Sequence, residues 1–449
     1  MSHHVDPNKN VNLTIDGIPV TVPEGTKILS AAKKVNINIP VLCEHPELCK
    51  RALCRICVVE CDGRGKLATA CSNDVWEGVK IVTNNKRLST IRRTIIELIL
   101  ANHPQDCLSC IRNKNCELQS LALSYGIYKN PFNNNVESQP PKIESKTIVR
   151  EMSKCVKCSR CVEVCQEVQA IRAINTANRS SEYRITTPYE HSLEDSNCVF
   201  CGQCAKVCPV GAIYEHDQTA EVWEKLNNNG LRAIAQVSPD LAAALQSECA
   251  AEQTITTGKM ISAIKLLGFD KVYDASIAAE AANSELNREL EQRQKTGGKL
   301  PLISGSSEGV ARFVKNFYPD LAAHLSDGKT PRRVFAEDIK NAYSAAEKLE
   351  ISSITTVSFV PDLSQKYTAK KDETDFALTA KELARMFKLA GIMVETLPEA
   401  PFDTVASDLP KAANSPPSAE IVDGYAKARE VMETIHSGKC ASNRVIILS

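Results

Sequence analysis

Two short runs decide how this chain folds: CVKCSRCVEVC at residues 155–165 and CVFCGQCAKVCP at residues 198–209. Both follow the pattern C-x-x-C-x-x-C-x-x-x-C, and Pro209 comes directly after the last cysteine of the second run. Repeated C-x-x-C steps bring several sulfurs within reach of one metal centre. The two runs therefore predict a compact, cysteine-rich unit over residues 151–217 that holds two metal centres.

This spacing is that of bacterial ferredoxins with two 4Fe–4S clusters, in which the fourth cysteine of each run crosses to the other cluster. Zinc is the alternative, because four thiolates also suit that ion, but the doubled run with its crossover cysteine and proline favours iron–sulfur clusters. We expect two sets of ligands: Cys155, Cys158, Cys161 and Cys208 for one cluster, and Cys198, Cys201, Cys204 and Cys165 for the other.

A third group of possible ligands lies in HPQDCLSCIRNKNC, residues 103–116. This histidine–cysteine group contains His103, Cys107, Cys110 and Cys116. One imidazole and three thiolates fit a structural zinc site and a 4Fe–4S cluster about equally. The place of the group between two other cysteine groups favours the 4Fe–4S cluster. A neutral imidazole in place of an anionic thiolate should raise the reduction potential of that cluster.

The first cysteine group, LCEHPELCKRALCRICVVECDGRGKLATAC at residues 42–71, has six cysteines, two more than a 2Fe–2S cluster needs. Cys54 and Cys57 form a C-x-x-C step. Cys49 gives plant-type spacing to Cys54, whereas Cys43 gives a longer loop. Cys61 and Cys71 compete for the fourth position, and spacing alone does not decide between them.

The whole chain limits the classes of function. Of its 19 cysteines, 17 lie between Cys43 and Cys208, a distribution that does not suit a small disulfide-stapled domain. The 54 basic and 54 acidic side chains balance, so no charge excess indicates a nucleic-acid partner. The polar start MSHHVDPNKN does not resemble a signal peptide, and the most apolar run, TIIELILA, is interrupted by Glu97. We expect a soluble, cytoplasmic protein that does not itself insert into a membrane.

The order of patterns predicts a multidomain protein of α+β and α/β class. VNLTIDGIPVTV (residues 11–22) indicates a hairpin and GTKILSAAKKVN (25–36) a helix, as in a β-grasp ferredoxin. A further helix is expected to end near His103, and a final one to span 419–437 after Ser418, with Gly438 beyond its end. The expected divisions are a 2Fe–2S β-grasp domain (1–83), a 4Fe–4S domain with the histidine–cysteine group (84–128), a linker (129–150), a two-cluster ferredoxin domain (151–217) and a two-lobed α/β domain (218–449).

These motifs together resemble a known family. IPVLCEHPEL, LCRICVVE, LATACS, NHPQDCLSCIRNKNCELQ and the two ferredoxin runs resemble the N-terminal half of iron-only (FeFe) hydrogenases and the large iron–sulfur subunit of complex I. The resemblance makes His103 a 4Fe–4S ligand. It also implies that the 2Fe–2S ligands are Cys43, Cys54, Cys57 and Cys71, with Cys49 and Cys61 as spares.

The second half resembles the hydrogenase catalytic domain in GKMISAIKLLGFDKVYDASIAAEAANSE, GVARFVKNFYPDLAAHLSDGKTP, FALTAKELARMFKLAGI and VDGYAKAREVMETIHSGK. Its catalytic motifs depart from the family. The family's T-S-C-C-P-G-W is here SGSSEGV, with Ser306 and Ser307 in the cysteine places, and M-P-C is VPD, with Asp362. The third signature, C-x-x-x-C, would follow NRVIILS, where the sequence ends. Serine is a poor substitute for thiolate, so we expect the site of the hydrogen-activating cluster to be vacated and Cys249 and Cys440 to be ordinary thiols.

The resemblance implies an electron-transfer subunit with one 2Fe–2S and three 4Fe–4S clusters and no catalytic residue of its own. Its expected partners are an NAD(P)-binding flavoprotein, a thioredoxin-like 2Fe–2S subunit, ferredoxin, and a molybdenum or tungsten oxidoreductase such as formate dehydrogenase, in a complex from an anaerobe that could perform flavin-based electron bifurcation. Two alternatives are an active FeFe hydrogenase with an atypical site and an iron–sulfur redox sensor.

Overall fold

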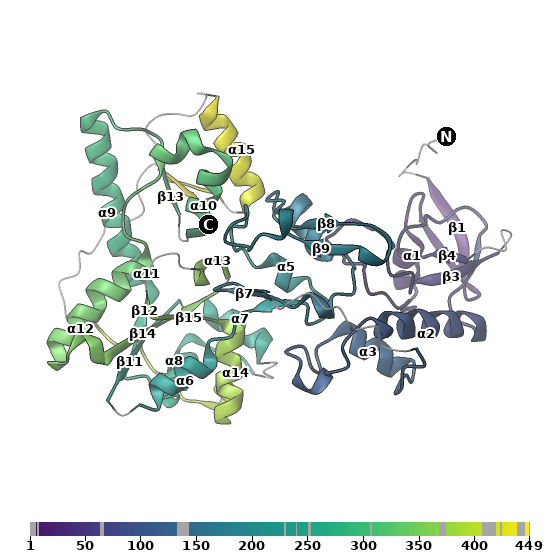
Figure 1. Ribbon diagram of the computed structural model, residues 1–449, viewed down its shortest axis with the longest axis horizontal. Helices are drawn as coiled ribbons and strands as arrows, with labels where there is room; N and C mark the ends of the chain where they lie inside the picture. Colours follow the sequence, from purple (N-terminus) through teal and green to yellow (C-terminus); the bar gives the residue numbers. More distant parts are fainter. Residues whose placement is uncertain are drawn as a thin grey trace.

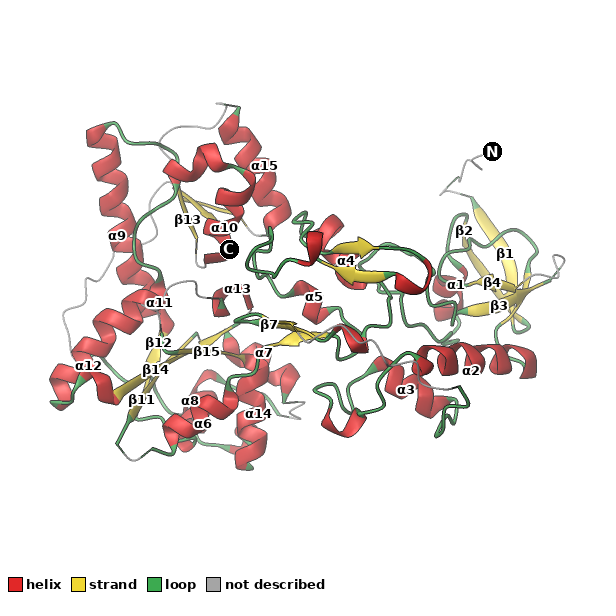
Figure 2. Cartoon of the chain, in the orientation of Figure 1, coloured by secondary structure: helices red, strands yellow, loops and turns green. Residues whose placement is uncertain are grey.

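The computed structural model describes residues 6, 9–62, 67–132, 143–228, 230–238, 240–249, 253–305, 308–361, 363–367, 374–405, 419–422, 424–437 and 445–448. The molecule is elongated: a small N-terminal sheet lies at one end, the two lobes of the C-terminal half lie at the other, and the cysteine-rich segments lie between them (Figure 1). The predicted class is confirmed, since helices and sheets occur together in several domains (Figure 2). In the described segments, no helix is both long and apolar enough to span a bilayer.

The N-terminal domain is a five-stranded sheet with strand order β2-β1-β5-β3-β4. The hairpin expected from the sequence is present, with Asp16 and Gly17 at its turn, both at positive φ, as a type I′ turn requires. Alternate residues of β1, Val11, Leu13 and Ile15, are buried in the core together with the first turn of the helix. The elements are β1 (Asn10–Ile15), β2 (Ile18–Pro23), α1 (Ile28–Lys34), β3 (Val58–Cys61), β4 (Leu67–Thr69) and β5 (Lys80–Val82).

Helices α2 (Lys86–Ala101) and α3 (Glu117–Ser124) flank the histidine–cysteine group. The side chain of Asn85 caps α2 by accepting a hydrogen bond from the Leu88 amide at 2.8 Å. The buried Arg92 attaches this helix to the sheet by donating to the carbonyls of Val58 and Thr83, at 2.6 and 2.9 Å. Helix α2 ends just before His103, as the sequence predicts.

The ferredoxin-like unit is short on regular structure. Its elements are β6 (Ile143–Glu144), β7 (Ile148–Arg150), α4 (Arg160–Glu163), β8 (Asn175–Ala177), β9 (Arg184–Thr186), α5 (Gln203–Lys206) and β10 (Ile213–Glu215). Strand β7 pairs antiparallel with β10 and with β6. The end of the segment expected to be a linker is thus part of this sheet, because Ile148 and Val149 are buried and complete its ladder.

The first C-terminal lobe is a parallel sheet in the order β12-β11-β14-β15, with helices on both faces. Ala233, Ala235 and Val237 of β11 belong to the core on one face, and Ile234 to the core on the other. The strands are β11 (Arg232–Val237), β12 (Lys271–Asp274), β14 (Ile354–Val360) and β15 (Phe376–Thr379). Helices α6 (Thr219–Leu226), α7 (Leu241–Glu248), α8 (Thr257–Leu266) and α14 (Ala380–Ala390) cover one face, and α9 (Ala275–Thr296), α11 (Pro331–Val334) and α12 (Lys340–Glu347) the other.

The second lobe is a smaller parallel sheet in the order β13-β17-β16. It comprises β13 (Leu302–Gly305), α10 (Glu308–Phe317), β16 (Ala419–Val422), α15 (Tyr425–His436) and β17 (Val445–Leu448), and α13 (Leu363–Lys366) lies beside α10. The prediction that the last helix starts at 419 is wrong. Residues 419–422 pair with β17, and Gly424, at φ 84° and ψ 146°, has a non-helical backbone. Ser418 and Gly438 lie outside the described residues.

Candidate iron–sulfur sites

The two C-x-x-C-x-x-C loops have the same backbone conformation. Lys157 and Ser159 in the first loop have φ values of 55° and 62°, and the matching Phe200 and Gly202 in the second have 58° and 73°. In each loop the amide two residues after the first cysteine donates to that cysteine's sulfur at 3.4 Å. Left-handed residues are rare outside glycine. Their repetition at equivalent positions therefore shows that both loops curl around a point in the same way.

The structure places the fourth cysteine of each run beside the other run. Cys208, from the second run, lies with Cys155, Cys158 and Cys161 around one small cavity, closed on its other sides by apolar residues and Pro209. Cys165, from the first run, contributes to the electrostatic environment of Cys198 and Cys204, and its sulfur accepts a hydrogen bond from the Ala173 amide at 3.3 Å.

Burial raises the pKa of these thiols, to about 11 for Cys155 and about 12 for Cys158 and Cys198. A buried thiolate needs positive charge beside it, and a four-thiol set closing on one point provides a place for a metal cluster. In the described part of the chain no three His, Cys, Asp or Glu side chains converge on one ion-sized position. The donor sets nevertheless fit clusters, whose ligands surround a larger body than a single ion.

The histidine–cysteine group lies directly beside the first ferredoxin-type site. Cys110 packs so closely on Gly211 that a Cβ there would be 2.7 Å from the sulfur. The amide of Glu117, the residue after Cys116, donates to the Pro209 carbonyl at 3.0 Å. His103 is buried, and its Nδ1 has no hydrogen-bond partner in the described structure. An unused imidazole nitrogen in such a place fits a metal ligand.

The electrostatics around His103 agree with that interpretation. Desolvation lowers the pKa of His103, which favours the neutral imidazole that can bind a metal. Burial raises the pKa of the Cys116 thiol, and the charges of Cys107 and Cys110 act in the same direction. Lys154 lies between this group and the ferredoxin unit, where it pairs with Asp106 at 3.2 Å and Glu151 at 2.9 Å.

In the β-grasp domain, the structure brings together Cys43, Cys54, Cys57 and Cys71. The sulfurs of Cys57 and Cys71 are 3.3 Å apart, and the Cys54 amide donates to the Cys43 sulfur at 3.5 Å. A hydrogen bond from the Cys54 thiol lowers the pKa of Cys43 to about 6, and the same bond raises that of Cys54. Cys49 is exposed, and Cys61 lies on β3 in the apolar core. The geometry thus groups the four cysteines that the family resemblance implied.

One arginine that sequence reasoning missed connects three of these groups. Arg160, between Cys158 and Cys161, is buried and donates to the carbonyl of Glu44 at 2.8 Å and to both carboxylate oxygens of Glu117, at 2.6 and 2.8 Å. Glu44 follows Cys43, and Glu117 follows Cys116. A bidentate arginine fixes both distance and orientation, so the loops of three candidate sites are held in one frame. A charged residue between two ligand cysteines was the signal in the sequence.

A second missed arginine joins the ferredoxin-like unit to the C-terminal half. Arg312 of α10 donates to the carbonyls of Glu194, Ser196 and Cys198, at 2.8, 3.0 and 2.9 Å. Its guanidinium also lies over the stacked rings of Phe200 and Tyr367, whose centroids are 3.8 Å apart. Leu363 packs on Gly202, where a Cβ would be 2.5 Å from the leucine side chain. The loop of Cys198 is therefore held by the C-terminal half.

The residues predicted to mark the vacated site, Ser306, Ser307 and Asp362, lie outside the described residues, as does Cys440. Cys249 is described: it follows α7, packs against the core of the first lobe, and has a pKa raised by desolvation. Among the described residues, no group of metal-ligating side chains includes it.

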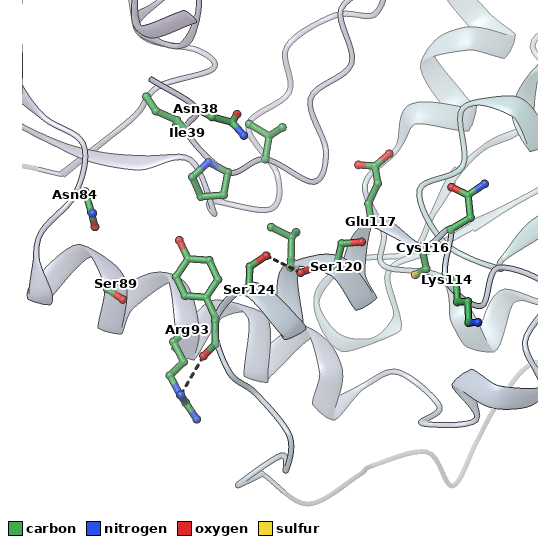
Figure 3. Close-up of a pocket in the computed structure, with 15 residues that line it drawn as sticks. Asn38, Ile39, Asn84, Ser89, Arg93, Lys114, Cys116, Glu117, Ser120 and Ser124 are labelled. Atoms are coloured by element: carbon green, nitrogen blue, oxygen red, sulfur yellow. Dashed lines mark hydrogen bonds between the residues drawn. The ribbon is translucent and has the colours of Figure 1, made fainter. Parts of the chain in front are cut away.

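A pocket of about 770 Å³ opens between the 38–41 segment of the β-grasp domain and helices α2 and α3 (Figure 3). Cys116 and Glu117 lie at one end of it, and at the other Arg93 donates to the Tyr125 carbonyl at 3.1 Å. Its lining is about evenly polar and apolar. It adjoins the histidine–cysteine group but is lined by one cysteine alone, so it is not itself a cluster site.

Four family models match successive parts of the chain. They are described as a 2Fe-2S iron-sulfur cluster binding domain (residues 8–86), the NADH-ubiquinone oxidoreductase-G iron-sulfur binding region (92–131), the ferredoxin-like domain of NADH-quinone oxidoreductase subunit 3 (145–214) and the C-terminal domain of the iron only hydrogenase large subunit (232–445). The chain therefore carries both 2Fe–2S and 4Fe–4S binding domains.

Relatives extend the match along nearly the whole chain. The NADP-reducing hydrogenase subunit HndD of Solidesulfovibrio fructosivorans is 36% identical over 413 residues, which is 88% of this chain and 71% of the relative. Iron hydrogenase 1 of Clostridium pasteurianum is 30% identical over 403 residues, 87% of this chain and 70% of the relative. The 75 kDa subunit of NADH-ubiquinone oxidoreductase from Reclinomonas americana is 32% identical over 216 residues, 48% of this chain and 31% of the relative. The chain thus belongs to the iron-only hydrogenase family, with a hydrogenase-like C-terminal domain joined to iron–sulfur domains like those of complex I.

Proposed function

We propose that this chain is an electron-transfer subunit of an NAD(P)-linked oxidoreductase complex and that it has no hydrogenase activity of its own. The observation that carries the proposal is a contrast along the chain. Four groups of candidate ligands are joined by short contacts in one half, whereas serine and aspartate occupy the cysteine positions of the hydrogenase motifs in the other. Iron–sulfur clusters supply one-electron transfer when they are bound.

The proposed cofactors are one 2Fe–2S and three 4Fe–4S clusters. The 2Fe–2S ligands are Cys43, Cys54, Cys57 and Cys71; the 4Fe–4S ligands are His103, Cys107, Cys110 and Cys116, then Cys155, Cys158, Cys161 and Cys208, then Cys198, Cys201, Cys204 and Cys165. Support comes from the repeated backbone of the two ferredoxin loops, the crossover of Cys165 and Cys208, and the unpartnered nitrogen of His103.

The contacts favour a branched arrangement with the Cys155 group at its centre. Arg160 joins the Cys155 group to the Cys43 and Cys116 loops. Cys110 packs on Gly211, which lies close to this group. The charge of Cys204, from the second ferredoxin-type site, acts on Cys161. Electrons that enter through either N-terminal group would reach the Cys198 group through this centre. Such convergence suits a subunit that serves more than one redox partner.

The C-terminal domain serves, in this proposal, as a scaffold and docking surface. Ser306, Ser307 and Asp362 stand where the family has cysteines, and hydroxyl and carboxylate oxygens are hard ligands that do not replace thiolates at iron–sulfur centres. Its two parallel sheets nevertheless retain buried cores, the second shared with the ferredoxin-like unit, and Arg312 holds the loop of Cys198. We infer that the domain is kept for its contacts.

The proposed partners follow from the chemistry that the sequence motifs leave to other subunits. No G-x-G-x-x-G turn leads from a strand into a helix in the described structure, so NAD(P) and flavin chemistry would come from another subunit. We propose an NAD(P)-binding flavoprotein, a thioredoxin-like 2Fe–2S subunit and ferredoxin as electron partners in the cytoplasm. A molybdenum or tungsten oxidoreductase, with formate dehydrogenase as the specific candidate, would take the place of the missing hydrogen chemistry.

Native purification tests this proposal. Tagged protein isolated anaerobically from its own cells should carry a flavoprotein in near-equal amount, together with a molybdenum or tungsten subunit, when analysed by mass spectrometry. The isolated chain should show slow dye-mediated electron transfer and no NADH oxidation. Recovery of a lone chain would contradict the assembly. Robust hydrogen evolution after expression with hydrogenase maturation proteins would contradict the loss of the catalytic site.

A further inference from the structure

Arg150 is a buried cation that the electron-transfer proposal does not yet use. It is the last residue of β7 and is 1% exposed. Its Nη2 donates one long hydrogen bond, 3.3 Å, to the Ile185 carbonyl, whereas its Nε and Nη1 are buried without a partner in the described structure. Burying a charge is costly unless an opposite charge lies nearby. A guanidinium with two unused donors therefore requires a counter-charge.

The candidate counter-charges are cysteines from both ferredoxin-type sites. Burial lowers the pKa of Arg150, and the charges of Cys161, Cys204, Cys155 and Cys198 act in the opposite direction. Two of these cysteines belong to each candidate cluster. Arginine remains protonated in proteins even when it is buried. The guanidinium is thus a fixed positive charge shared between the two sites.

The fold places this side chain through elements from both cysteine runs. Arg150 pairs with Ile213 in the β7–β10 ladder, five residues after Cys208. The next residue, Glu151, donates its amide to the Ala212 carbonyl at 2.8 Å. Cys155 follows β7 by one short turn. The segments that carry the ligands therefore fix the position of Arg150, which is buried and not a flexible surface side chain.

Arg92, which has a structural role in the same molecule, differs from Arg150. Arg92 is buried to a similar degree and its Nε also lacks a partner in the described structure. Its Nη2, however, donates to two main-chain carbonyls, at 2.6 and 2.9 Å, and so joins α2 to the sheet. Arg150 has one weak carbonyl contact, and the charges that act on it are those of cysteines from two sites. Its surroundings match those of a charge that compensates an anionic group.

We propose that Arg150 is a positioning residue that raises the reduction potentials of both ferredoxin-type 4Fe–4S clusters, with its unpartnered N–H groups directed at cluster or thiolate sulfur. This inference rests on the proposed ligand sets. Uptake of one electron, delivered by a neighbouring cluster, adds one negative charge and changes no covalent bond. A nearby buried cation stabilises that added charge, and hydrogen bonds to the sulfurs do the same.

The test is a redox titration followed by EPR on the full-length, cluster-loaded protein, with Arg150→Met, Arg150→Gln and Arg150→Lys. Loss of the charge should lower the equilibrium constant for reduction of the two ferredoxin-type clusters about tenfold, which corresponds to about 59 mV for a one-electron couple. Arg150→Lys should recover at least half of that shift. The control, Arg92→Met, removes a buried arginine elsewhere and should leave these two potentials unchanged.

Iron content and EPR of the unmodified protein distinguish a wrong ligand assignment from a wrong role for Arg150. If all clusters are present and neither potential changes in Arg150→Gln, the role of Arg150 is refuted and the ligand assignment stands. If the unmodified protein lacks ferredoxin-type 4Fe–4S signals, the ligand assignment fails and this inference fails with it. Should Arg150→Met not load its clusters, the comparison of Lys with Gln decides, and equal potentials in those two variants would overturn the proposal.

Discussion

The ferredoxin-like unit and the hydrogenase-like half of this chain hold their shapes by different means. In the former, short strands and one-turn helices carry the ligand loops, and left-handed residues and arginines fix those loops. In the latter, the first lobe has its own apolar core on each face of a parallel sheet, whereas the smaller sheet of the second lobe shares one apolar cluster with the ferredoxin-like unit. We expect a lobe with such cores of its own to keep its architecture without metal ligands.

The same comparison explains why the two parts stay joined. One apolar cluster runs from Val199 and Phe200 of the ferredoxin-like unit to Phe313 and Leu363 of the hydrogenase-like half. Arg312 adds three hydrogen bonds to the loop of Cys198 across this boundary. The hydrogenase-like half, in which serines stand in cysteine places, therefore still supports the Cys198 site of the ferredoxin-like unit.

Removal of iron should separate the two parts most clearly. After anaerobic chelation, we expect residues 151–217 to lose protection against hydrogen exchange, because metal binding supplies folding free energy where regular structure is short. Strands β11 and β14 of the first lobe's parallel sheet, residues 232–237 and 354–360, are buried along almost their whole length and should remain protected. Hydrogen exchange with mass spectrometry measures both. Equal loss of protection in both regions would show that the C-terminal half also depends on metal.

Replacing single cysteines should show the same difference between the two parts, measured as iron content. The proposed load is about 14 iron atoms, three times four plus two. Cys158→Ser should lower it by about four, the content of one cubane cluster, whereas Cys249→Ser, in a half without a predicted cluster, should leave it unchanged. Iron analysis and EPR of anaerobically purified variants provide the measurement. An equal loss of iron from Cys249→Ser would mean that this thiol binds a cluster.

Within the β-grasp domain, replacements should distinguish ligands from spares. Cys43 lies against Cys54, whereas Cys49 is exposed. Cys43→Ser should therefore abolish or alter the 2Fe–2S EPR signal, and Cys49→Ser should change it little. The reverse result would favour plant-type spacing. Two silent variants would indicate that a spare cysteine can replace a lost ligand.

The sequence predicts candidate ligand loops from their spacing, but it does not predict the contacts that connect those loops. Spacing along the chain determines which sulfurs can reach one point, so the crossover of Cys165 and Cys208 could be predicted from local pattern. Arg150, Arg160 and Arg312 contact residues 35, 116 and up to 118 positions away and carry no local pattern that reveals their partners. The start of the last helix was missed for the same reason: residues 419–422 form a strand because β17 lies beside them.

The contact between the two parts should have a moderate effect. Arg312→Ala removes three hydrogen bonds from a charged donor and its contact with the Phe200 and Tyr367 rings, at a cost of about 2 kcal/mol. The EPR signal of the Cys198 cluster should broaden, and that cluster should be lost faster in air. The control is Lys315→Ala, an exposed position on the same helix. Identical behaviour of the two variants would show that Arg312 does not support the site.

The smallest effect is expected where the family has its catalytic cysteines. Ser306→Ala combined with Ser307→Ala removes the two hydroxyls that stand in the cysteine places. Because hydroxyl oxygen is a poor ligand for iron–sulfur clusters, the iron content, the visible absorption and the dye-mediated electron-transfer rate should all stay within error of the unmodified protein. Ser304→Ala, in the same motif, serves as the matched control. A loss of about four irons, one cubane's content, confined to the double variant would mean that the serines hold a cluster, and the hydrogenase-like half would then resemble the ferredoxin-like unit in depending on metal.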